Sequence, residues 1–143
     1  MYRTGGDPLN GRIQIMKKIL VEWFCFEKEG QTCGRCDENF QVIKQTVEKM
    51  LPVLNERDIA VDLKAHLLDE SRIEHSNTIT INGKNILELL NERDHIFTYC
   101  RSCTAITGKP SECRVFIYKN MAYESIPEEM LREAILQEAS TLP

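Results

Sequence analysis

A C-x-x-C pair, Cys33 and Cys36, lies between an apolar run at residues 19–26 and an amphipathic stretch at residues 35–54. The first segment predicts a buried strand. The second predicts a helix, because its apolar residues recur at steps of three and four. The cysteines therefore fall where a strand passes into a helix. Backbone N–H groups are unpaired at a helix start and the helix dipole is positive there, so a thiolate is favoured over a thiol.

The rest of the chain predicts further strands and helices. Apolar and polar residues alternate over residues 59–67, which predicts a second strand, and the helical crossover makes the two strands parallel. A β-branched run at residues 78–81 meets Asn82 and Gly83, a strong hairpin signal. Beyond it we expect a short helix at residues 86–92, a cysteine-bearing loop at residues 94–114, a hairpin at residues 115–124, and a final helix with a capping box of Ser125 and Glu128.

This order of elements predicts an α/β domain of thioredoxin-like fold. We expect a mixed central sheet flanked by helices, with an extra cysteine-bearing loop and a C-terminal hairpin plus helix. At 143 residues the chain is long enough for one such core without disulfide staples. We expect a single domain over residues 16–143 and a disordered leader at residues 1–15, with Met16 as an alternative translation start. Pro52 should kink the predicted long helix or end it early.

Composition argues against several classes of partner. The net charge is −4 and there is no long basic run, so neither nucleic acid nor an anionic membrane surface is an expected partner. No apolar stretch approaches the ~20 residues of a membrane span, and the chain start is too polar for a signal peptide. We therefore expect a cytoplasmic protein. In that compartment clustered cysteines are more often redox-active or metal-binding than structural.

The strand-to-helix position suits Cys33 and Cys36 for dithiol–disulfide exchange. Cys33 would be the exposed nucleophile, and Cys36, one turn into the helix, would be the shielded resolving thiol. Arg35 should favour the thiolate by its charge, whereas Asp37 and Glu38 should oppose it. The substrate would be a protein or small-molecule disulfide or thiol, and no cofactor is required. The same pair could instead bind a metal or metalloid, or only pack.

Ser76 and Asn77 are predicted to line the same site as substrate-binding residues. In thioredoxin-like proteins a cis-proline ahead of a strand faces the C-x-x-C, and here Asn77 stands at that place. A cis bond before asparagine would cost ~2.5–4 kcal/mol, so we expect a trans bond. The cis-proline blocks metal binding in that superfamily. Its absence therefore favours metal capture over plain thioredoxin chemistry.

A second cysteine cluster, Cys100, Cys103 and Cys113, leaves three alternatives open. The three could bind zinc with a fourth ligand such as His95, in a tetrahedral site with Zn–S distances of ~2.3 Å. Two of them could form a disulfide that relays electrons to or from the first pair. Both C-x-x-C pairs could instead join into one four-thiolate site, and arsenite would also suit such thiols. Cys25, inside the first strand, is expected to be a buried thiol.

Several motifs together resemble an uncharacterised bacterial and archaeal family of thioredoxin-like fold. They are Val21-Glu-Trp, the C-x-x-C, the run Ser76-Asn-Thr-Ile-Thr-Ile-Asn-Gly83 and the late Cys113-Arg114. The resemblance covers residues 17–139 and implies the fold, but it brings no established activity. Thioredoxin's Trp-Cys-Gly-Pro-Cys is replaced here by Gln31-Thr-Cys-Gly-Arg-Cys36. The expected function is thiol–disulfide exchange, with a metal- or metalloid-binding module without turnover as the alternative.

Overall fold

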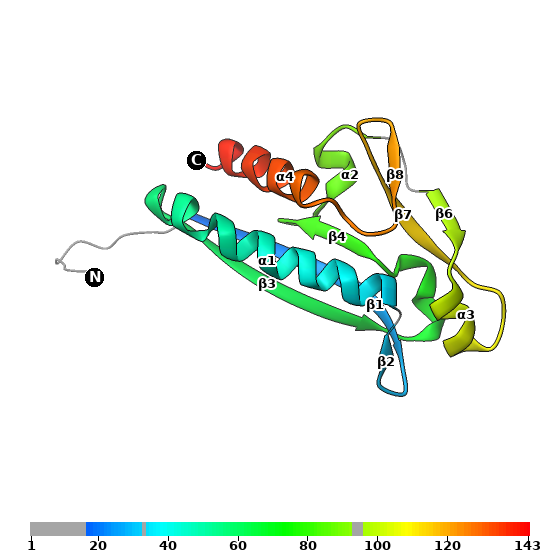
Figure 1. The fold of residues 1–143 in the computed structure, drawn as a ribbon. Coiled ribbons are helices and arrows are strands. Elements are labelled where there is room, and N and C mark those ends of the chain that lie inside the picture. Colours follow the sequence, from blue (N-terminus) through cyan, green and yellow to red (C-terminus); the bar gives the residue numbers. More distant parts are fainter. Residues whose placement is uncertain (1–16, 33, 93–95) are drawn as a thin grey trace.

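The computed structural model describes residues 17–32, 34–92 and 96–143, which form a mixed α/β structure (Figure 1). The predicted leader at residues 1–15 lies outside the described residues. The elements are β1 (Lys17–Lys28), β2 (Gln31–Thr32), α1 (Gly34–Glu56), β3 (Ile59–Leu68), the 3-10 helix η2 (Glu70–His75), β4 (Thr78–Ile81), β5 (Lys84–Asn85), α2 (Ile86–Leu89), β6 (Ile96–Tyr99), α3 (Arg101–Thr107), β7 (Glu112–Tyr118), β8 (Met121–Tyr123) and α4 (Glu128–Thr141).

The main sheet is built around β1. Strand β3 runs parallel to β1, with Leu63 opposite Val21, and β4 runs antiparallel on the other side, with Ile81 opposite Val21. Strand β5 returns along β4 after Asn82 and Gly83, which both have positive φ. The predicted parallel pair and the predicted hairpin are therefore confirmed. The short strand β2 pairs with the end of β1, just before α1 begins.

Helices α1 and α4 pack against each other and against the main sheet (Figure 1). Trp23 of β1 stacks on Phe40 of α1, with ring centroids 4.9 Å apart, so this face of β1 points toward α1. The buried residues of the core include Ile19, Val21 and Cys25 from β1, Ile43, Val47, Met50 and Leu54 from α1, and Leu131, Ala134 and Ile135 from α4. Burying each large apolar side chain contributes about 1.5–3 kcal/mol. The predicted apolar faces of both helices and the buried Cys25 thiol are confirmed.

Helix α1 continues through Pro52 to Glu56, so of the two expected effects of this proline, a kink or an early end, the early end is wrong. Proline removes one backbone hydrogen bond from a helix interior. The last turn nevertheless carries Leu54, which is completely buried in the core, and that burial favours continuation of the helix. Although α1 has 23 residues, no helix of the described residues is both long and apolar enough to cross a membrane.

The segment expected to be a cysteine-bearing loop, residues 94–114, contains regular structure instead. Strand β6 and helix α3 lie within it, and β6 pairs with β7, with Thr98 opposite Cys113. Strands β7 and β8 form the hairpin predicted over residues 115–124. The loop prediction is wrong because β6 has only four residues and α3 only seven, too few to show a clear periodicity. These elements lie at one end of the main sheet (Figure 1).

The predicted capping box of the last helix is also wrong. Helix α4 begins at Glu128 with Pro127 in the capping position, and no described side chain caps its first turn. Ser125 lies two residues before that position, and its Oγ donates to Glu38 Oε1 of α1 at 2.6 Å. The Glu128 carboxylate accepts from Lys49 Nζ at 2.9 Å. Both side chains therefore connect α4 and its approach to α1 instead of capping α4.

Candidate functional site

Cys36 lies in the first turn of α1 and is 0% exposed. Its Sγ is 3.3 Å from Ser76 Oγ, in the corner just before β4. The same Ser76 hydroxyl accepts a hydrogen bond from the Phe26 N–H at 2.9 Å. The Ser76 proton is therefore available for donation to a Cys36 thiolate. Cys33 lies outside the described residues; β2 ends at Thr32 and α1 begins at Gly34.

Asn77 braces the corner that brings Ser76 to Cys36. It is completely buried, with φ at +66°, a left-handed conformation that asparagine tolerates better than most residues. Its N–H donates to the Phe24 carbonyl at 2.7 Å, and its Oδ1 accepts from Asn39 Nδ2 of α1 at 2.6 Å. No peptide bond among the described residues is cis, so the expected trans bond before Asn77 is confirmed. Of the predicted pair, Ser76 contacts the cysteine and Asn77 holds the backbone in place.

Arg35 connects the start of α1 to the three-stranded sheet formed by β6, β7 and β8. The residue is only 9% exposed, and its Nη1 donates to Thr98 Oγ1 at 3.1 Å and to the carbonyls of Cys113 and Arg114 at 3.2 and 3.3 Å. Its Nη2 lies 3.4 Å from Glu124 Oε2. The sequence suggested only that its charge would favour a thiolate. The guanidinium also joins the backbone of β6 and β7 to the helix that carries Cys36.

The two acidic residues expected to oppose a thiolate are both hydrogen-bonded at the helix surface. Asp37 Oδ1 accepts from Thr32 Oγ1 at 2.5 Å, and Glu38 Oε1 accepts from Ser125 Oγ. Both residues are exposed, whereas Cys36 is buried on the inner side of the same turn. Solvent therefore screens their charges from the buried sulfur more than the spacing along the chain suggests.

The start of α3 lies against the start of α1. Cys100 and Gly34 line one cavity of about 390 Å³, and a Cβ at Gly34 would lie 3.6 Å from Ser102 Oγ. The structure therefore brings the second cysteine motif next to the first. The buried hydrophobic core includes Cys36, Cys100, Cys103 and Cys113.

The described residues do not by themselves form a metal site. Within residues 17–32, 34–92 and 96–143, no three histidine, cysteine, aspartate or glutamate side chains are grouped closely enough to hold a metal ion. This includes Cys100, Cys103 and Cys113 taken together. A thiolate metal site here would need a ligand from outside the described residues, such as Cys33 or His95, the predicted fourth ligand.

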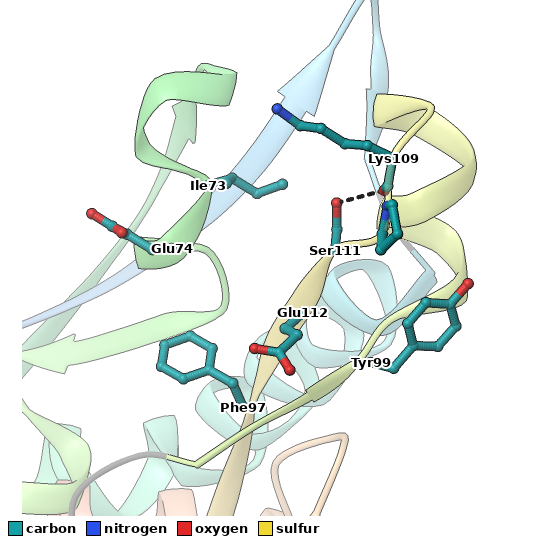
Figure 2. A pocket seen from close by; sticks show the side chains of 8 residues that line it. Ile73, Glu74, Phe97, Tyr99, Lys109, Ser111 and Glu112 are labelled. Atoms are coloured by element: carbon teal, nitrogen blue, oxygen red, sulfur yellow. Dashed lines mark hydrogen bonds between the residues drawn. The ribbon is translucent and has the colours of Figure 1, made fainter.

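A further cavity of about 600 Å³ lies between η2 and the β6–β7 pair (Figure 2). Ile73 and Glu74 line it from η2, and Phe97 and Glu112 line it from β6 and β7. It shares no described lining residue with the cavity beside Gly34, so the two cavities are distinct. The sequence did not indicate this cavity, because part of its wall comes from the segment predicted to be a loop.

These features define a mixed α/β protein with a buried cysteine at the start of its longest described helix. A family model described as "Domain of unknown function (DUF2703)" matches residues 19–135. The match covers most of the chain, so the chain belongs to this family. Comparison with curated proteins and with solved structures found no match. The matched residues nearly coincide with residues 17–139, over which the motifs predicted a family resemblance. The description of the family assigns no activity to it.

Proposed function

We propose that this protein is a thiol–disulfide oxidoreductase with Cys33 as nucleophile and Cys36 as resolving thiol. The observation that carries the proposal is the 3.3 Å contact between Cys36 Sγ and Ser76 Oγ in a buried corner under the first turn of α1. A buried thiol at this place is shielded from external disulfides and accessible to a disulfide formed at the neighbouring cysteine. A hydrogen bond from Ser76 would favour its thiolate.

A thioredoxin-like fold is part of the proposal. The parallel β1–α1–β3 unit is followed by antiparallel β4 and β5 and by α4, which packs beside α1. This is the β-α-β-β-β-α order expected of that fold. Elements α2, β6, α3, β7 and β8 would then be an insertion between β5 and α4. The inserted segment would cover the start of α1, where it brings Cys100 close to Gly34.

The proposed reaction consists of two exchanges. The Cys33 thiolate attacks one sulfur of the substrate disulfide, forms a mixed disulfide and releases the first substrate thiolate, which takes up a proton. The Cys36 thiolate then attacks the Cys33 sulfur, releases the second substrate thiol and leaves a Cys33–Cys36 disulfide. Two electrons and two protons pass to the substrate. A cellular thiol reductant must restore the dithiol, and a cytoplasmic location would supply one.

Reduction of a model protein disulfide by the purified chain tests this function. We expect Cys33→Ser to abolish turnover and Cys36→Ser to accumulate the mixed disulfide at Cys33. Cys25→Ala is the control, because this buried thiol lies in β1 outside the proposed site, and it should retain activity. Unchanged turnover in Cys33→Ser would contradict the proposal.

A second candidate function is a metal- or metalloid-binding module. It is favoured by the cavity that Gly34 and Cys100 share, since this brings two cysteine motifs together. Cys33, Cys36 and Cys100 would supply the thiolates for zinc or arsenite. Native mass spectrometry should then show stoichiometric metal that is lost on thiol alkylation. A protein that binds neither zinc nor arsenite would rule this candidate out.

A further inference from the structure

Arg114 of β7 carries a buried charge whose hydrogen-bond donors are only partly used. The residue is 7% exposed, and its Nη2 donates to the Glu74 carbonyl at 3.2 Å. No described residue accepts a hydrogen bond from its Nε or Nη1. The guanidinium lies 5.3 Å from the centroid of the Phe97 ring, which stabilises the charge but leaves these donors unpaired. Burial lowers the pKa of the Arg114 guanidinium, although the negative charge of Glu74 partly opposes this effect.

The Arg114 side chain lines a cavity of about 440 Å³ on one face of the main sheet. Phe24, Thr78 and Thr80 also line it. Side chains alternate along a strand, so these three lie on the face opposite to Trp23, which packs against α1. The cavity is therefore on the side of the sheet that α1 does not cover.

The polar part of the cavity is suited to an anion. Arg72 and His75 of η2 line it together with Arg114, and none of the described residues that line it carries a carboxylate. The Thr80 hydroxyl is a second buried polar group that lacks a hydrogen-bond partner among the described residues. Glu74 lines the neighbouring cavity (Figure 2), and its carboxylate also lies 3.8 Å from His75 Nε2. Unpaired buried donors cost free energy that a bound acceptor would recover.

We propose that this cavity binds a small organic carboxylate, with the carboxylate on Arg114 and an apolar body against Phe24 and Leu68. Both apolar residues line the cavity, and its volume lies within the ~300–1,000 Å³ typical of small-molecule sites. Guanidinium N–H groups match the geometry of carboxylate oxygens, and the Thr80 hydroxyl can donate a further hydrogen bond. The site does not depend on the proposed redox function, because no cysteine is among the described residues that line the cavity.

Calorimetric titration of the full chain, in a buffer free of carboxylates, tests the proposal with three probes: benzoate, benzyl alcohol and inorganic phosphate. We expect benzoate to bind one to one, at least about tenfold more tightly than benzyl alcohol, which lacks the charge. Phosphate lacks the apolar body and should bind more weakly than benzoate. Absence of benzoate binding, equal binding of the alcohol, or tighter binding of phosphate would each overturn the proposal.

Substitutions distinguish benzoate binding in this cavity from nonspecific binding to positively charged side chains on the surface. Arg114→Met keeps an apolar stem and removes the donors, so benzoate affinity should fall about 10- to 100-fold. Arg72→Gln changes an exposed residue at the cavity and spares the core, and it should weaken binding a few-fold. Arg57→Gln, exposed just beyond the end of α1, is the matched control and should leave affinity unchanged. Unchanged affinity in folded Arg114→Met, or in Arg72→Gln if the first variant does not fold, would overturn the proposal.

Discussion

Among single residues, Ser76 has the most direct effect on the buried corner. Its Oγ accepts from the Phe26 N–H and contacts Cys36 Sγ, so Ser76→Ala leaves a buried amide without an acceptor. We expect this change to lower the free energy of unfolding by about 1–3 kcal/mol in urea denaturation. Ser140→Ala is the matched control, because this exposed hydroxyl bonds only the nearby Gln137 carbonyl; it should change stability by less than about 0.5 kcal/mol. Equal stability of the two variants would contradict this role.

Residue patterns explain why Ser76 could be predicted and the role of Arg114 could not. Ser76 and Asn77 stand before a short β-branched run, at the place where thioredoxin-like proteins bring a loop to their C-x-x-C. Arg114 is followed by the apolar residues Val115 and Phe116, which indicates only a charge within a buried strand. Arg114 contacts Glu74 and Phe97, which lie far from it along the chain. The spacing of apolar residues in the sequence does not indicate such tertiary contacts. The available signals were a charge inside an apolar run and the Cys113-Arg114 motif, and neither indicates a cavity.

Among the elements, β6 and β7 depend on Arg35 for their attachment to α1. Its side chain bonds Thr98 and the backbone carbonyls of Cys113 and Arg114. Arg35→Met should therefore speed amide hydrogen exchange over residues 96–118 and leave β1 and β3 protected. Lysine at this position should not restore protection, because its compact ammonium cannot reach several acceptors in one plane. An unchanged exchange pattern would contradict this role of Arg35. Equal loss of protection in residues 96–118 and in β1 and β3 would contradict it as well.

Helix α1 contains a second testable feature, the proline in its interior. Pro52 is exposed and has no N–H for the Glu48 carbonyl four residues earlier. We expect Pro52→Ala to raise the free energy of unfolding by about 1–3 kcal/mol, after allowance for the greater freedom of the unfolded chain. Val53→Ala, at the exposed neighbouring position, should change stability far less. Chemical denaturation compares the two, and a destabilised Pro52→Ala would show that the proline is needed for the helix geometry.

The elements also differ in how far the sequence predicts them. Strand β1, helix α1 and strand β3 are long and periodic, and their predicted positions agree closely with the structure. Strand β6 and helix α3 are short, and they are held by distant partners such as Arg35, 63 positions from Thr98. Gly108, with φ at +79°, ends α3 and was the only local sign of a helix there. Short elements stabilised by distant contacts leave little periodic signal.

For the molecule as a whole, Glu138 links the last helix to the main sheet. Burial alone would raise the pKa of Glu138, but hydrogen bonds from Asn82 Nδ2 at 2.9 Å and Lys84 Nζ at 3.0 Å outweigh it and lower this pKa below 4.5. The folded pKa is thus below the unfolded one. The ionised group therefore contributes stability above about pH 4.5, and this contribution is lost as the pH falls through the folded pKa.

Removal of the Glu138 charge should change the acid stability of the whole molecule. We expect Glu138→Gln to flatten the fall in unfolding free energy below about pH 4.5, measured by urea denaturation across pH. Glu129→Gln is the control. The Glu129 side chain is 72% exposed, and its carboxylate makes a long ion pair of 3.8 Å with Lys119 Nζ, so its charge should contribute little to stability. In this control, the free energy of unfolding should fall with decreasing pH as steeply as in the unaltered protein. The same slope in both variants would contradict the assignment of this pH dependence to Glu138.

Disulfide exchange between Cys33 and Cys36 can be tested by disulfide mapping of the full chain by mass spectrometry, after equilibration in glutathione buffers of increasing oxidising strength. We predict that Cys33 and Cys36 form one disulfide, with loss of two hydrogens, and that reduction restores both thiols. Cys25 should remain a thiol, since it is buried in β1. If Cys33 and Cys36 stay separately alkylatable across the whole series, they are not a working redox pair and the proposed function is contradicted.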